Sequence, residues 1–203
     1  MSHRSLVATL LVVSIGVAAF WTETDGLRAL TSESARRLRV AQTPVAVPPI
    51  RLELATGETI DFAYFAGRVV LIDFIYTRCP SLCVALGADF ARLQDALRRA
   101  GRDDIRLLSI SFDPEHDTPE ALRSYGEGFG ADMRTWSLAR VQDVAEMKRL
   151  LGTFGVVVIP DELGGFTHNA AIHFVNRGGR LAQIFDQGDI DTVLKRVGVW
   201  KSG

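Results

Sequence analysis

The sequence predicts an α/β fold in which helices flank a mixed central sheet. Two near-continuous apolar runs, at residues 69–76 and 105–112, are typical of buried central strands, and each is followed by a helical pattern. Residues 171–185 form two further apolar segments around the turn Asn176-Arg177-Gly178-Gly179, which predicts a closing hairpin. A chain of 203 residues has room for one domain of about 150 residues and a short additional segment.

The composition is that of a globular protein, with 47% apolar and 23% charged residues. The formal net charge is −1 and the 23 lysines and arginines are spread along the chain, so nucleic acid is excluded as a favoured partner. Only two cysteines occur, Cys79 and Cys83, which excludes a scaffold of several disulfides and places any thiol chemistry at one position.

The remaining elements follow in order along the chain. Residues 51–60 alternate around Thr56-Gly57 and predict a short hairpin. Helices are expected at residues 85–99, after the capping sequence Asp117-Thr118-Pro119, at 141–151, and from Asp189 to 197. The cysteines therefore lie in the turn between a central strand and the first of these helices. This order of elements is thioredoxin-like.

Residues 1–21 predict a signal peptide or an uncleaved signal anchor. Residues 6–21 carry no charge and follow His3 and Arg4. At about 1.5 Å per residue the run reaches about 24 Å, slightly less than a hydrocarbon core of about 30 Å. Residues 22–48, polar and then rich in proline, are expected to be a linker, and residues 49–203 the folded domain. Export would place the domain in an oxidising compartment.

The spacing of the two cysteines suits either a disulfide or a shared metal ion. Cys79 and Cys83 are four residues apart, so one helical turn would bring both sulfur atoms to the same side. The N-terminus of the following helix and the adjacent Arg78 are expected to lower the pKa of at least one thiol. Two thiolates and one imidazole select Cu(I) and can also hold Cu(II), whereas Zn(II) would need a fourth ligand.

Among the four histidines, His168 is the favoured third ligand. His3 precedes the apolar run, His116 lies in a turn, and His173 lies within a predicted strand, where a packed side chain is expected. His168 ends the loop of residues 161–168, which a thioredoxin-like fold brings towards the cysteine turn.

Four sequence blocks in order make this chain similar to the Sco/SenC family over residues 50–198. They are an apolar strand, Thr-x-Cys-Pro-x-x-Cys at 77–83, Ser-x-Asp-Pro-Glu-x-Asp-Thr at 111–118, and His168. The resemblance implies a membrane-anchored, thioredoxin-like copper protein of cytochrome c oxidase assembly, with Cys79, Cys83 and His168 as ligands. Its partner would be the oxidase copper subunit or another copper or thiol protein, at the periplasmic face of a bacterial inner membrane. Val84 and Thr167 stand where the family usually has proline and aspartate.

A second function remains open, that of a thiol–disulfide oxidoreductase or redox sensor. In that case Cys79 is the nucleophile that attacks a disulfide of the partner, and Cys83 resolves the mixed disulfide. Asp73 relays a proton to or from Cys83. Asp73 interrupts the apolar strand at a position similar to that of the buried acid of thioredoxins, although an acid facing a wet sheet edge is the simpler interpretation. Asp113 and Asp117 are interpreted as a turn and a helix N-cap rather than as an acidic metal site.

Overall fold

The computed structural model describes residues 3–23, 31–79, 82–162 and 164–199. The chain forms two compact units, Met1–Thr43 and Pro44–Gly203. The second unit contains the cysteines and all the predicted strands.

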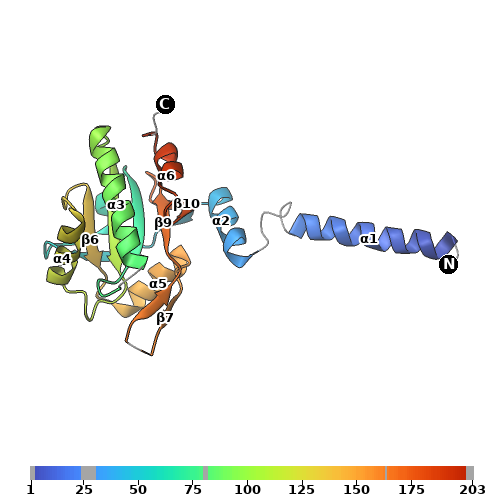
Figure 1. Ribbon diagram of the computed structural model, residues 1–203, viewed down its shortest axis with the longest axis horizontal. Helices are drawn as coiled ribbons and strands as arrows, with labels where there is room; N and C mark the ends of the chain where they lie inside the picture. Colours follow the sequence, from blue (N-terminus) through green and yellow to red (C-terminus); the bar gives the residue numbers. More distant parts are fainter. Residues whose placement is uncertain (1–2, 24–30, 80–81, 163, 200–203) are drawn as a thin grey trace. The chain divides into compact units, whose positions relative to one another are not determined.

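The first unit holds two helices, α1 (His3–Glu23) and α2 (Ser32–Gln42) (Figure 1). Among the described residues, no helix combines the length and the apolar character needed to cross a membrane. A reciprocal cap begins α2, because Ser34 N–H donates to Thr31 Oγ1 over 3.1 Å and Thr31 N–H donates to Ser34 Oγ over 3.0 Å. The segment predicted as a linker, residues 22–48, therefore contains a helix.

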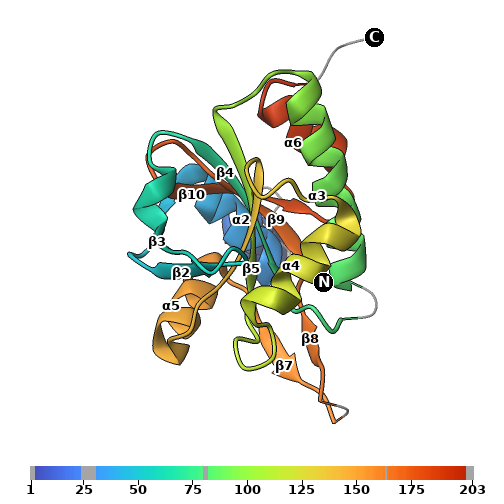
Figure 2. The same cartoon turned by 90° about the vertical axis from the view of Figure 1, so that its left-hand side faces the viewer.

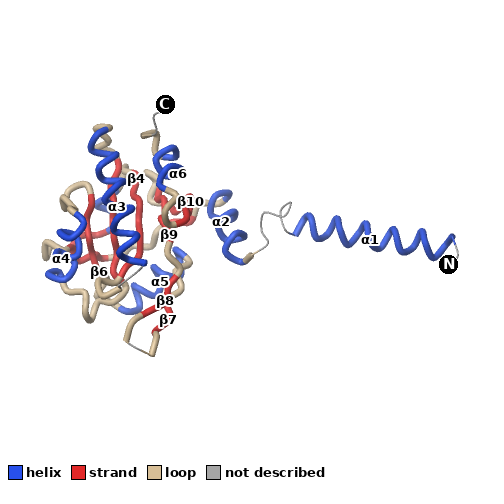
Figure 3. Tube along the Cα trace, in the orientation of Figure 1, coloured by secondary structure: helices blue, strands red, loops and turns tan. Residues whose placement is uncertain are grey.

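The second unit is built on a mixed eight-stranded sheet, as predicted, with the order β1-β10-β9-β4-β5-β6-β2-β3. Its strands are β1 (Val45–Ala46), β2 (Arg51–Leu54), β3 (Thr59–Asp61), β4 (Val69–Ile75), β5 (Ile105–Ser111), β6 (Trp136–Arg140), β9 (Ala171–Val175) and β10 (Arg180–Asp186). The central β4 pairs in parallel with β5 and antiparallel with β9. Two short strands, β7 (Val158–Pro160) and β8 (Phe166–His168), form a separate antiparallel pair (Figure 3).

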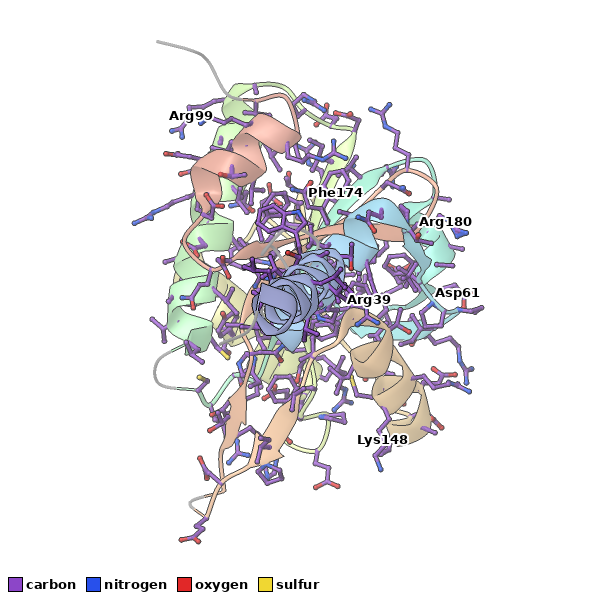
Figure 4. The ribbon with its side chains drawn as sticks, turned by 90° about the vertical axis from the view of Figure 1, so that its right-hand side faces the viewer. Arg39, Asp61, Arg99, Lys148, Phe174 and Arg180 are labelled. Atoms are coloured by element: carbon purple, nitrogen blue, oxygen red, sulfur yellow. The ribbon has the colours of Figure 1, made fainter. Side chains whose placement is uncertain are left out.

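Helices cover both faces of the sheet (Figure 2). They are α3 (Leu82–Arg99), α4 (Pro119–Phe129), α5 (Val144–Phe154) and α6 (Ile190–Arg196), and a single 3₁₀ turn spans Phe62–Phe65. Successive residues of β4 face opposite sides, so Phe74 packs its ring against Phe154 of α5 at 5.2 Å while Asp73 faces α3. On α5, Met147 is buried and Lys148 extends into solvent (Figure 4).

The contact between α3 and α4 is close because Gly87 has no side chain. A Cβ atom at Gly87 would lie 2.6 Å from Cε2 of Phe129 on α4. This arrangement holds the N-terminal half of α3 against α4, and Tyr125 of α4 donates a hydrogen bond of 2.5 Å to the Cys83 carbonyl. The first turn of α3, which carries Cys83, is thereby fixed in position.

Most predicted elements are confirmed, with small shifts of their ends. The predicted helix at 141–151 runs instead from Val144 to Phe154, because Asp143 is its N-cap and accepts the Glu146 N–H. The strands β1, β6, β7 and β8 were not predicted. The first, third and fourth have only two or three residues, and β6 is a five-residue segment with two polar positions. Such segments become strands only through their partners.

Candidate metal and thiol site

The two cysteines lie where β4 ends and α3 begins. Both are among the described residues, and they are thiols rather than a disulfide. Cys83 is in the first turn of α3, and its backbone N–H points at Cys79 Sγ at 3.4 Å. The Tyr76 N–H in turn points at Cys83 Sγ at 3.4 Å. Cys79 precedes the helix instead of lying on it, so the two sulfurs are brought together by these N–H···S contacts and not by helical periodicity.

The two thiols have different environments. Cys83 is fully buried and Cys79 is 7% exposed. Burial raises the pKa of the Cys83 thiol, the Tyr76 N–H opposes this shift, and the neighbouring Cys79 and Asp73 add to it. The thiol for which the sequence predicts a lowered pKa is therefore not Cys83. The helix N–H that faces Cys79 Sγ makes Cys79 the thiol better placed to carry a negative charge.

His168 lies in contact with Cys83. It is the last residue of β8, and its Nε2 lies 3.7 Å from Cys83 Sγ although 85 positions separate the two residues. The side chain is 6% exposed, and its Nδ1 has no hydrogen-bond partner in the part of the chain that the structure describes. Burial lowers the pKa of His168, partly offset by a backbone interaction with Asn169, so the neutral imidazole is favoured near pH 7. A neutral imidazole is the form that binds a metal ion.

An aromatic cluster sets the position of the histidine ring. The His168 ring packs against Phe112 at 5.1 Å and against Tyr76 at 6.4 Å between centroids. Tyr76 also fixes β8 directly, because its hydroxyl donates to the Phe166 carbonyl at 3.2 Å and accepts the Phe166 N–H at 3.3 Å. The strand that carries His168 is thus tied to the residues that follow β4.

The side chain of Asn169, the residue that follows His168, bonds to the backbone just before β7. Asn169 Oδ1 accepts the Val157 N–H at 2.7 Å, and Asn169 Nδ2 donates to the Gly155 carbonyl at 3.0 Å. Asn169 is a functional-site neighbour that the sequence does not predict. No local pattern marks it, since its two partners belong to the segment that follows α5.

Asp73 is fully buried in β4, which excludes the wet sheet edge. Among the described residues, no donor lies within hydrogen-bond geometry of either of its carboxyl oxygens. Burial raises the pKa of Asp73 from 3.8 to about 7, although the nearby Ser109 hydroxyl favours the ionised form. Asp73 also acts electrostatically on Cys83, so the protonation states of the two groups are linked.

Asp113 and Asp117 form hydrogen bonds that connect residues 111–118 to the cysteine turn. The prediction that Asp117 is the N-cap of the next helix is wrong. The N-cap of α4 is Thr118, whose Oγ1 accepts the Ala121 N–H, and not Asp117. Asp117 is fully buried and accepts hydrogen bonds from Thr77 and Ser111. Asp113 Oδ2 accepts a hydrogen bond of 2.9 Å from Arg78 Nη2, and the two side chains form an ion pair. The sequence pattern of residues 111–118 marks Asp113 and Asp117, but it does not show that they bond to Arg78 and Thr77.

The donor chemistry of the three predicted ligands fits copper. Within the described ranges, no group of three or more His, Cys, Asp or Glu side chains has the spacing of a preformed metal site. Cys83 and His168 are in contact, and Cys79 Sγ lies next to the Cys83 N–H. Two soft sulfur donors and a neutral imidazole whose Nδ1 is unpartnered suit Cu(I) by ligand type.

Comparison with known proteins agrees with the fold. The SCO1/SenC family matches residues 41–197. A SCO1 homologue of Bacillus subtilis is 25% identical over 142 residues, which cover 69% of this chain and 73% of that protein. The solved structure of BsSco, a member of the Sco family of cytochrome c oxidase assembly proteins in which a disulfide switch is identified, has a TM-score of 0.69 at 23% identity, over 77% of this chain and 94% of that one. That of Bradyrhizobium japonicum ScoI with copper bound has a TM-score of 0.62 at 24% identity, over 75% and 99%.

Proposed function

Because the chain belongs to the SCO1/SenC family, we propose that it binds one copper ion through Cys79, Cys83 and His168 and transfers it to a partner protein. The partner is the copper subunit of cytochrome c oxidase or another copper or thiol protein. The observation that carries the proposal is the 3.7 Å contact between Cys83 Sγ and His168 Nε2, two buried soft donors from distant parts of the sequence.

The environment of the site favours binding that depends on pH. Cys83 is protonated at neutral pH because burial raises the pKa of its thiol, so copper must displace a proton to bind a thiolate. His168 is neutral and needs no such displacement. Copper is the cargo here, and the exchange of a proton for a metal ion gives a partner with competing thiolates a route to remove it.

A Cu(I) titration of the reduced full chain without oxygen tests this proposal. We expect one tightly bound copper per chain, and a dissociation constant raised by about 100-fold or more in His168→Ala, since one of three ligands is lost. His116→Ala is the matched control, because it removes a half-exposed imidazole that bonds to Asp113. Equal affinities of the parent chain and His168→Ala would rule out the three-ligand site.

The buried carboxyl of Asp73 favours a second function, thiol–disulfide exchange. The Cys79 thiolate attacks a disulfide of the partner, and one partner sulfur leaves as a thiolate. Asp73 accepts the proton of Cys83, whose thiolate then attacks Cys79 Sγ and releases the second partner thiol. The Cys79–Cys83 pair ends as a disulfide, and the partner gains both electrons.

The two functions respond to different variants. Under thiol–disulfide exchange, Asp73→Asn slows reduction of a disulfide substrate, because Cys83 loses its proton acceptor, while His168→Ala leaves the rate largely unchanged. Under copper transfer, His168→Ala abolishes tight binding and Asp73→Asn does not. A reduction rate unaffected by Asp73→Asn would remove the role of this carboxyl.

We also propose that the N-terminal residues tether or export the domain to the periplasmic side of a bacterial inner membrane. The uncharged run of residues 6–21 behind Arg4 supports this proposal. Membrane fractionation, with the N-terminus of the recovered chain determined by mass spectrometry, distinguishes an anchor from a cleaved signal. Full recovery of the uncleaved chain from the cytoplasm would contradict both.

A further inference from the structure

A single carboxylate connects the start of the cysteine turn to a second loop. Asp117 lies in the connection between β5 and α4 and is fully buried. Its Oδ2 accepts the Thr77 N–H at 3.0 Å, and its Oδ1 accepts the Thr77 hydroxyl at 2.6 Å. The Ser111 hydroxyl donates to Oδ2. Three donors, two from Thr77 and one from Ser111, therefore converge on one buried carboxylate that lies 40 residues beyond Thr77 in the sequence.

The bonds to Asp117 restrict the backbone two residues before Cys79. Thr77 is held through both its N–H and its hydroxyl. The preceding residue, Tyr76, is held by Cys83 Sγ and by β8, and the Cys79 N–H closes the turn onto the Tyr76 carbonyl at 3.2 Å. Because Thr77 is fixed, the position of Cys79 relative to the start of α3 depends on Asp117.

A neighbouring ion pair strengthens the same connection from the solvent side. Arg78 donates to Asp113 Oδ2 at 2.9 Å, and Asp113 Oδ1 lies 2.8 Å from His116 Nδ1. The Arg78 side chain is 45% exposed, whereas Asp117 is fully enclosed. A surface ion pair contributes little, so the buried carboxylate carries most of the restraint.

We propose that Asp117 is a positioning residue of the copper and thiol site: through Thr77 it holds Cys79 Sγ against the N-terminus of α3, next to Cys83 and His168. The proposal rests on the function proposed above, since it assigns Asp117 the task of keeping the first ligand in place. Asp117 itself contacts neither the metal nor the reacting sulfur atoms.

Asparagine and valine substitutions test the proposal in the full chain. Asp117→Asn keeps the size of the side chain but can accept at only one of its two former acceptor atoms. Thr77→Val removes the hydroxyl donor with little change in volume, and Thr77→Ser restores it. We measure the rate of Cys79 alkylation by iodoacetamide in the reduced, copper-free chain, the Cu(I) dissociation constant, and the melting temperature.

We expect alkylation of Cys79 to be faster by about tenfold in Asp117→Asn, because the loop opens more often, and by about threefold in Thr77→Val. The Cu(I) dissociation constant should rise by about tenfold and threefold in the same variants. Thr77→Ser should restore both values to those of the parent chain.

A purely structural role gives a different pattern. A lower melting temperature in Thr77→Val, with alkylation rate and copper affinity unchanged, would overturn the proposal. If Asp117→Asn does not fold, as judged by circular dichroism, the Thr77→Val and Thr77→Ser pair decides alone. Since alkylation needs no copper, a parent chain that binds no copper would refute the proposed function while the alkylation rates still decide the role of Asp117.

Discussion

The buried carboxyl of Asp73 predicts how the stability of the reduced protein depends on pH. Its pKa is raised from 3.8 to about 7, so the folded state binds a proton that the unfolded state has released across this window. The free energy of unfolding therefore falls as the pH rises from about 4 to about 7. Above about pH 7 the contribution of Asp73 to this free energy stays constant. The full penalty is about 4 kcal/mol, at about 1.4 kcal/mol for each unit of the shift from 3.8 to about 7.

Asp73→Asn removes the ionisable group and keeps the side-chain size, so the difference in unfolding free energy between variant and parent isolates this contribution. We expect the difference to shift in favour of the variant by about 2.5 kcal/mol between about pH 5 and about pH 8. The amide of asparagine adds a constant offset, because it is also buried without a partner, and this offset cancels in the comparison.

Urea unfolding of the reduced full chain at several pH values, followed by tryptophan fluorescence and circular dichroism, measures this difference. The other titrating groups, including His168 and Asp117, are present in both chains and cancel. A difference that stays constant within about 0.5 kcal/mol across the range would show that Asp73 titrates normally, and the reasoning from burial would fail.

Three further predictions concern the surroundings of the site. Gly87→Ala should lower the unfolding free energy by about 1–3 kcal/mol in urea, because its Cβ would lie 2.6 Å from the Phe129 ring; an unchanged value would contradict the close packing. Asn169→Ala should cost about 1 kcal/mol by the same measurement, since two hydrogen bonds at the hairpin base are lost; no loss would mean that water replaces them. Iodoacetamide should modify Cys79 before Cys83 in the reduced chain, because Cys83 is fully buried and its thiol pKa is raised; peptide mass spectrometry showing equal labelling would refute this order.

The local pattern of the sequence was sufficient for the α/β class and for the strand–turn–helix that carries the cysteines. The apolar runs that become β4 and β5 differ from their predicted bounds by one residue at the C-terminal end. Such elements can be predicted because periodicity and turn residues act over a few neighbouring positions. The motif spacing and the chemistry of sulfur and imidazole likewise pointed to Cys79, Cys83 and His168 before any contact was known.

The tertiary structure decided the properties that depend on distant residues. The burial of Asp73 follows from the packing of α3 and the neighbouring strands around β4, and a single strand pattern does not distinguish a buried acid from one at a wet edge. The contact of His168 with Cys83 spans 85 positions and requires β8 to be tied to Tyr76. The role of Asp117 follows in the same way from a loop 40 residues beyond Thr77. Hydrogen bonding, desolvation and the resulting pKa shifts are set by neighbours in space, and only the fold determines which neighbours those are.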